Sequence, residues 1–96
     1  MRLTPREVEV IRNSILKLDP KAKIFLYGSR VQDHLKGGDI DVLVISDHLK
    51  FKDRLTIVTD ILLKIGEQKF DLLIKSESEA KSDAFVQSIL KSAAQI

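Results

Sequence analysis

The sequence predicts a layered α/β (α+β) domain built around a small mixed β-sheet with flanking helices. Short apolar runs alternate along the chain with segments whose apolar residues recur at helical spacing. About a dozen residues separate the first two apolar runs, whereas a full helical segment separates the second run from the third. Short connections join antiparallel strands and helical crossovers join parallel strands. We therefore expect one antiparallel and one parallel pair in a sheet of at least three strands.

The first helix is predicted from its capping residues. Thr4-Pro5-Arg6-Glu7 has the pattern of a capping box with proline at the first helical position. Apolar residues then recur three and four positions apart until Asp19-Pro20, which ends the helical pattern. These apolar positions are Val8, Ile11, Ile15 and Leu18.

Three apolar runs, at residues 24–27, 40–45 and 70–74, are the predicted strands. Gly28 stops the first of them, in which the packing of the strand explains Tyr27, the only tyrosine. The run at 40–45 is almost wholly apolar, so it is expected to be a central strand that is buried on both faces.

Two further helices follow the second and third strands. Gly66 closes the first of these helices, and Ser76 with Glu79 forms a capping box for the last one. The predicted apolar face of the earlier helix comprises Phe51, Leu55, Val58, Ile61, Leu62 and Ile65. Its predicted solvated face carries the charges of Lys50, Lys52, Asp53 and Arg54. The predicted apolar face of the last helix comprises Phe85, Val86, Ile89, Leu90 and Ala93.

The composition is that of a globular domain. The chain has 96 residues, of which 44% are hydrophobic and 31% are charged. We expect residues 1–96 to form a single domain with a real core. The absence of cysteine excludes disulfides and thiolate metal sites and favours a reducing compartment, so we expect a cytoplasmic protein.

Two classes of partner are disfavoured by the sequence. The longest uninterrupted apolar run, at residues 42–45, is far too short to cross a bilayer, and the first residues do not lead into a signal-peptide core. The net charge is +2 with the two signs interspersed, which gives little long-range attraction for nucleic acid. We therefore expect neither a membrane nor a nucleic acid as the direct ligand.

Three carboxylates are predicted to meet at one edge of the sheet. Asp39 and Asp41 are two positions apart on a strand, so both point to one face with Cα atoms ~6.6 Å apart, and Asp71 lies one strand away, at ~4.8 Å. Unpaired carboxylates this close repel one another, so the cluster requires a cation. All-oxygen ligands suit Mg²⁺ or Mn²⁺, and Mg²⁺ is commonly bound by one or two carboxylates together with substrate phosphates. The sequence therefore predicts a metal site that takes a nucleoside triphosphate.

Gly28, Ser29 and Arg30 are the predicted nucleotide-binding residues. Gly28 lets the backbone approach a phosphate group closely, and Ser29 is placed to start a short helix whose N–H groups and hydroxyl face the anion. Arg30 has two readings, a charge-assisted contact with phosphate or a brace for the carboxylates.

These residues resemble the motifs of the DNA polymerase β-type nucleotidyltransferase superfamily, in particular its minimal members, the MNT domains. The resemblance rests on LYGSR at residues 26–30, GGDIDVLV at 37–44 and FDL at 70–72, and it covers the core of the chain. It implies a polymerase-β-like nucleotidyltransferase core. It also implies that Gly28 and Ser29 hold the triphosphate, that Asp39 and Asp41 bind the metal ions, and that Asp71 helps to activate the acceptor hydroxyl.

The resemblance further implies a reaction and a partner. The reaction is Mg²⁺-dependent transfer of a nucleoside monophosphate, AMP being favoured, from a triphosphate to a hydroxyl. Larger members carry a C-terminal domain for the acceptor or the base, whereas here one helix follows Asp71, so the acceptor is expected in trans. Small members resemble antitoxins that adenylylate a HEPN-type toxin ribonuclease, which makes such a toxin the predicted protein partner. Whether the chain forms a homo-oligomer stays open.

Two functions of other classes are kept as alternatives. One is a non-catalytic antitoxin or binding protein that neutralises its partner by complex formation. The other is an RNA-binding module, although one tyrosine, four phenylalanines and no tryptophan offer no stacking platform. His34 and His48 lie in predicted loops without metal-ligand spacing, so we expect both to be solvated.

Overall fold

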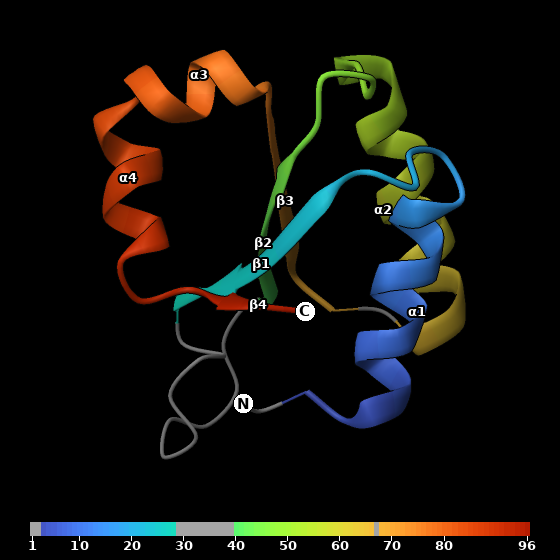
Figure 1. Cartoon of the computed structure of the whole chain (residues 1–96). Coiled ribbons are helices and arrows are strands. Elements are labelled where there is room, and N and C mark those ends of the chain that lie inside the picture. Colours follow the sequence, from blue (N-terminus) through green and yellow to red (C-terminus); the bar gives the residue numbers. More distant parts are fainter. Residues whose placement is uncertain (1–2, 29–39, 67) are drawn as a thin grey trace.

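The computed structural model describes residues 3–28, 40–66 and 68–96, and its elements are labelled in Figure 1. The helices are α1 (Pro5–Leu16), α2 (Phe51–Ile65), α3 (Glu77–Ser82) and α4 (Ala84–Leu90). The strands are β1 (Lys23–Tyr27), β2 (Ile40–Ile45), β3 (Phe70–Lys75) and β4 (Ala94–Gln95).

The described strands form one mixed sheet in the order β3-β2-β1-β4. β1 pairs with β2 in the antiparallel direction, and β2 pairs with β3 in the parallel direction. Both pairings confirm the expectation drawn from the connection lengths. β4, a short strand antiparallel to β1, was not predicted.

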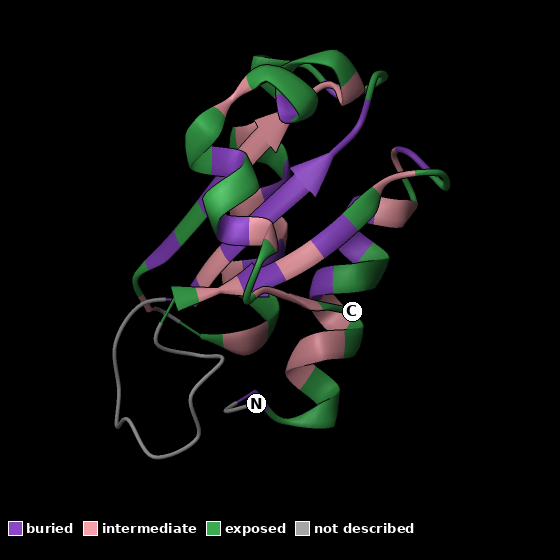
Figure 2. Ribbon diagram, turned by 60° about the vertical axis from the view of Figure 1, so that its left-hand side comes forward, coloured by how far each residue is buried: buried purple, intermediate pink, exposed green. Residues whose placement is uncertain are grey.

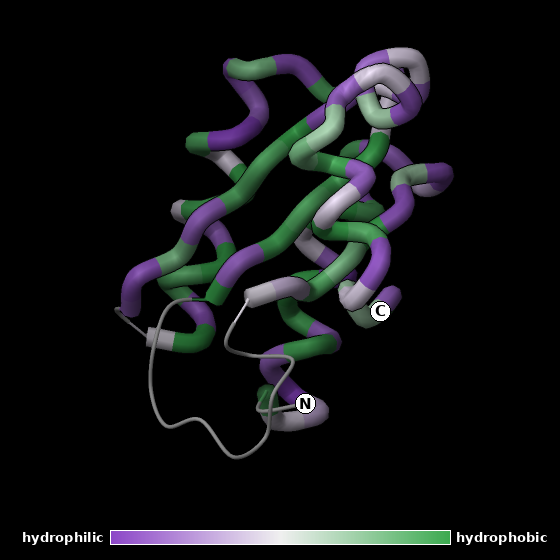
Figure 3. The backbone as a smooth tube through the Cα atoms, turned by 90° about the vertical axis from the view of Figure 1, so that its left-hand side faces the viewer, coloured by the Kyte–Doolittle hydropathy of each residue, from purple (hydrophilic) through white to green (hydrophobic). Residues whose placement is uncertain are grey.

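Helices cover both faces of the sheet (Figure 1). α1 and α2 pack on one face over a first core, to which Ile11, Ile24, Val42, Ile61 and Leu72 belong. α3 and α4 lie on the other face over a smaller second core, formed by Leu43, Ile45, Ala80, Val86 and Ile89. β2 is buried along most of its length, as Figure 2 shows, and the strands form the hydrophobic centre of the chain in Figure 3. No described helix is long and apolar enough to cross a membrane.

The predicted caps form as expected. The Thr4 hydroxyl accepts the N–H of Glu7, and the Glu7 carboxylate accepts the N–H of Thr4. The same reciprocal pair joins Ser76 and Glu79. Gly66 ends α2 with a φ of 93°, a backbone conformation that favours glycine.

The structure corrects the predicted apolar face of α2. Phe51 and Leu55 are 86% and 71% exposed, whereas Ile57 and Ile61 are buried. The buried face of α2 is therefore rotated toward Ile57, a residue that the predicted apolar face did not include. Phe51 and Leu55 belong to the side of α2 that turns away from the first core, which includes neither of them.

The predicted last helix is two helices. Asp83 has an extended backbone between α3 and α4, and its carboxylate accepts the N–H groups of Phe85 and Val86. An aspartate that caps a new helix stops the preceding one. The redirected α4 buries Val86 and Ile89, leaves Phe85 60% exposed and ends before Ala93.

Asp60 of α2 links this helix to α1 through its side chain. Its carboxylate accepts a hydrogen bond of 2.7 Å from the buried Ser14 hydroxyl of α1 and ion-pairs with Lys17 and Lys64. The Ser14 hydrogen bond, followed by that of Lys17, lowers the pKa of Asp60 from 3.8 to about 2.

We expect Asp60→Ala to lower the free energy of unfolding by about 1–3 kcal/mol near neutral pH, because it leaves the buried Ser14 hydroxyl without its acceptor. A carboxyl whose pKa is lowered in the folded state stabilises the fold above its ordinary value of 3.8. This contribution is lost as the pH falls toward about 2. Urea titrations should therefore show a difference between wild type and variant that shrinks over this interval. A difference that does not change with pH would contradict the assignment.

Candidate active site

The predicted carboxylates Asp41 and Asp71 lie side by side on neighbouring strands. Asp41 of β2 is the direct register partner of Asp71 on β3 and of Tyr27 on β1. Neighbouring strands are about 4.8 Å apart, so both carboxylates belong to one small volume. Asp41 is half-buried and Asp71 is exposed, so solvent reaches the pair from the β3 side. The predicted placement of these two residues is confirmed.

Strand alternation assigns Tyr27, Asp41 and Asp71 to one face of the sheet. Successive side chains on a strand point to opposite faces. On β2, Asp41 therefore shares its face with Leu43 and Ile45 of the second core. The three side chains form the polar end of the face that α4 covers further along.

Gly28 brings the end of β1 against Asp41. Its φ is +76°, a conformation that favours glycine, and a Cβ atom at this position would collide with Oδ2 of Asp41. Backbone and carboxylate are therefore as close as a residue without a side chain allows. The predicted role of Gly28, a close approach of the backbone to a phosphate group, stays a prediction.

Tyr27 is a neighbour of the acidic pair that the sequence argument had explained by strand packing alone. It packs against the second core, and burial raises the pKa of its hydroxyl above 10.0, with further increases from the negative charges of Asp41 and Asp71. The hydroxyl consequently stays protonated at neutral pH. The sequence could have revealed this neighbour only through the pairing of Tyr27 with Asp41 across the antiparallel strands, and that pairing requires the register to be known.

The other predicted site residues cannot be placed. Ser29, Arg30 and Asp39, together with His34, lie outside the described residues. His48 is described, in the turn after β2, away from the acidic pair.

The chemistry of the described donors fits a hard divalent cation. Asp41 and Asp71 offer only carboxylate oxygens, which suit Mg²⁺ or Mn²⁺ rather than a thiophilic metal. Among the residues that the structure describes, no group of three or more histidine, aspartate or glutamate side chains is arranged to hold a metal. A site of three carboxylates would therefore need a residue outside the described part of the chain, and Asp39 is the one that the sequence predicts.

We expect Gly28→Ala to destabilise the fold by about 1–2 kcal/mol from the left-handed backbone alone, and further through the collision with Asp41. The double variant Gly28→Ala/Asp41→Ala keeps the backbone strain but removes the colliding carboxylate. Measured in urea, the loss in free energy of unfolding of the double variant should therefore be smaller than the sum of the losses of the two single variants. Strictly additive effects would mean that the two residues are not in contact.

The comparison with known families agrees with this geometry. Residues 8–96 match the family model of the nucleotidyltransferase domain, so the match includes Gly28, Asp41 and Asp71. No curated protein matches the chain in a sequence comparison. The mixed sheet with helices on both faces is that of a polymerase-β-like nucleotidyltransferase fold. Because the match spans nearly the whole chain, this protein belongs to the nucleotidyltransferase domain family.

Proposed function

We propose that this nucleotidyltransferase moves a nucleoside monophosphate, AMP in preference, from a triphosphate to a hydroxyl group of a partner protein. The observation that carries the proposal is the register of Asp41 with Asp71, beside the close backbone approach at Gly28. A carboxylate pair next to a glycine turn supplies both parts that nucleotidyl transfer needs, a cation site and a place for phosphates.

In the proposed reaction the acceptor oxygen attacks the α-phosphorus, the bond from the α-phosphorus to its bridging oxygen breaks, and pyrophosphate leaves. Asp71 is exposed, so it accepts the proton of the incoming hydroxyl in this scheme. Asp41 is half-buried and lies against Gly28, so it holds the nucleotide side of the site. Asp39, Asp41 and Asp71 would hold Mg²⁺, which neutralises the charge on the phosphates. Ser29 and Arg30 are proposed to contact the triphosphate.

The proposed partner is a HEPN-type toxin, by the resemblance to minimal, antitoxin-like members of the superfamily. The test is to purify the chain from its native host together with the protein that binds it, and to incubate the pair with Mg²⁺ and each of the four ribonucleoside triphosphates. Intact-mass spectra of both chains are then recorded. We expect the toxin to gain one or more nucleoside monophosphate units, with ATP as the best donor.

Matched controls separate the reaction from binding alone. The same incubation with EDTA, and with Asp41→Asn in place of the wild type, should give no mass gain. A stable complex without any mass gain would contradict the proposal and favour the binding-only alternative. A gain with one triphosphate other than ATP would retain the transferase and correct the nucleotide.

A further inference from the structure

The outer edge of β3 carries backbone groups that the sheet does not use. The carbonyls of Lys69 and Lys75 accept N–H groups of Ile40 and Ser46, so they face β2. Residues alternate in direction along a strand, so the backbone groups of Phe70, Leu72 and Ile74 face away from the sheet. Within the described chain, only the Leu72 carbonyl among these groups accepts a hydrogen bond from a side chain, that of Arg54 Nε at 2.8 Å. Apart from the Leu72 carbonyl, this edge of β3 is therefore unpaired in the described part of the chain, and another strand can pair with it.

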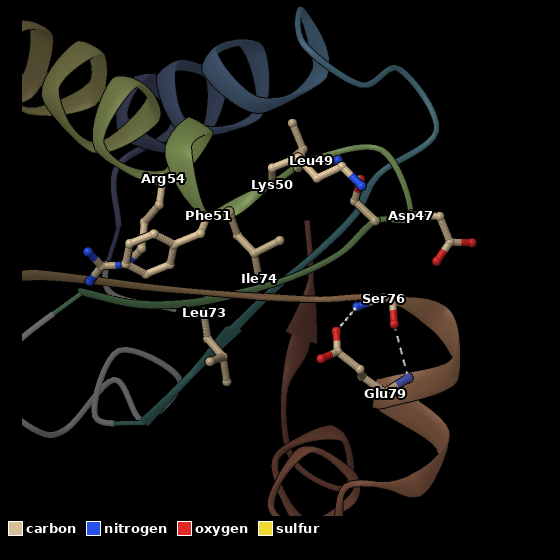
Figure 4. Close-up of a pocket in the computed structure, with 10 residues that line it drawn as sticks. Asp47, Leu49, Lys50, Phe51, Arg54, Leu73, Ile74, Ser76 and Glu79 are labelled. Carbon is tan, nitrogen blue, oxygen red and sulfur yellow. Dashed lines mark hydrogen bonds between the residues drawn. The ribbon is translucent and has the colours of Figure 1, made fainter.

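A groove of about 420 Å³ adjoins the C-terminal half of this edge, between β3, the turn after β2 and the starts of α2 and α3 (Figure 4). Phe51 and Arg54 of α2 lie on the same side of β3 as Ile74, and Leu73 points to the opposite side (Figure 4). Phe51 and its neighbour Leu55 are 86% and 71% exposed. An apolar surface is therefore available beside the open backbone.

The acidic and basic side chains that line the groove differ in the contacts that they already make. Glu79 accepts the N–H of Ser76, and Asp47 accepts the N–H of Glu77, so both acidic groups cap α3. For Lys50 and Arg54, no carboxylate partner occurs in the described part of the chain. The two carboxylates keep their negative charge beside α3, whereas the α2 side of the groove presents two positive side chains without an ion pair in the described chain. It is this α2 side that complements an acidic ligand.

We propose that the β3 edge binds an extended, acidic segment of the acceptor protein as an additional strand. The segment has acidic side chains toward Lys50 and Arg54 and apolar or hydroxyl side chains toward the Leu73 side. A strand in this place lies about 4.8 Å from β3, which also carries Asp71. Asp71 shares its face with Leu73, so a hydroxyl on that face of the bound strand is delivered beside it. This delivery rests on the proposed function, whereas the binding does not.

The test starts from a phage-displayed library of linear twelve-residue peptides, selected on the wild-type chain without nucleotide or metal. We expect acidic peptides without proline, with apolar residues at alternate positions. Synthetic versions labelled with a fluorophore should lose at least about tenfold in affinity for Lys50→Glu and Arg54→Glu, because like charges then face each other. Lys91→Glu, an exposed change beyond the groove, should stay within about twofold of the wild type.

Two further measurements examine the backbone pairing. Bound peptide should slow hydrogen exchange at the amides of Leu72 and Ile74, which face outward. Methylation of alternate peptide nitrogens should abolish binding by removing its donors. Selected peptides that ignore Lys50→Glu and Arg54→Glu, or that leave these amides unprotected, would overturn the proposal. An empty selection would do so too.

Failure of binding and failure of the proposed function can be told apart. Asp41→Asn should bind the selected peptides as the wild type does, because its side chain does not line the groove and β3 lies between it and the bound strand. Loss of transfer with retained peptide binding would therefore concern only the reaction. Loss of peptide binding with retained transfer to the partner would concern only the docking edge.

Discussion

Asp41→Asn is expected to abolish nucleotidyl transfer while the fold stays intact. Asparagine keeps the shape of the side chain against Gly28 but removes the negative charge from the centre of the site. Loss of one preorganised charged group costs roughly 10²–10³ in rate, and we expect the upper end because Asp41 lies between Tyr27 and Asp71. Single-turnover transfer to the partner, followed by intact mass, measures the loss. Glu9→Gln, the corresponding loss of charge at an exposed position of α1, should transfer at the wild-type rate.

The effect of Asp41→Asn can also be measured without an activity assay. Tyr27 is the only tyrosine and the chain has no tryptophan, so tyrosinate absorbance reports this hydroxyl alone. The charge of Asp41 raises the pKa of Tyr27, so Asp41→Asn should lower that pKa. The melting temperature should be unchanged or slightly higher, since one of two neighbouring negative charges is gone. Wild-type turnover in a variant with the lowered tyrosine pKa would remove Asp41 from the reaction.

Asp71→Asn is expected to separate binding from transfer. If Asp71 accepts the proton of the acceptor, the variant should bind the Mg²⁺-nucleotide within about tenfold of the wild type, or ~1.4 kcal/mol. Transfer should nevertheless fall by ~10² to 10⁴, the range typical of losing a general base. Nucleotide affinity by calorimetry and turnover by mass spectrometry give the two quantities. Equal losses in both would make Asp71 a ligand on the nucleotide side only, and no loss in either would make it a surface residue.

The fold was largely predictable because its signals are local. Capping residues such as Thr4 and Ser76 act within one turn, and the alternation of strands and helices follows from apolar periodicity. Two errors came from relying on apolar spacing alone. Phe51 has the helical spacing of a core residue but is 86% exposed, and Asp83 divides the last helix by capping its second half. Neither the rotation of a helix on the sheet nor the start of a new cap is visible in apolar spacing.

The site was predictable where it depends on strand register. The pairing of Asp41 with Asp71 follows once β2 and β3 are parallel and start level with each other. Arg54 was expected on a solvated face, but its side chain reaches the Leu72 carbonyl, a contact between elements that the sequence does not reveal. Tyr27 was likewise assigned to packing only, because its distance from Asp41 depends on the exact antiparallel register.

The next set of register partners on this face, Phe25, Leu43 and Leu73, is entirely apolar. It lies two residues further along each strand, about 6.6 Å from Tyr27, Asp41 and Asp71. The carboxylates therefore stand at a dielectric boundary, with solvent on one side and the hydrocarbon of the second core on the other. Field lines from the two charges cannot spread into the sheet, so their attraction for a cation is concentrated on the open side. An apolar residue such as Leu43 would thus contribute to the affinity of the proposed cation site without touching the ion.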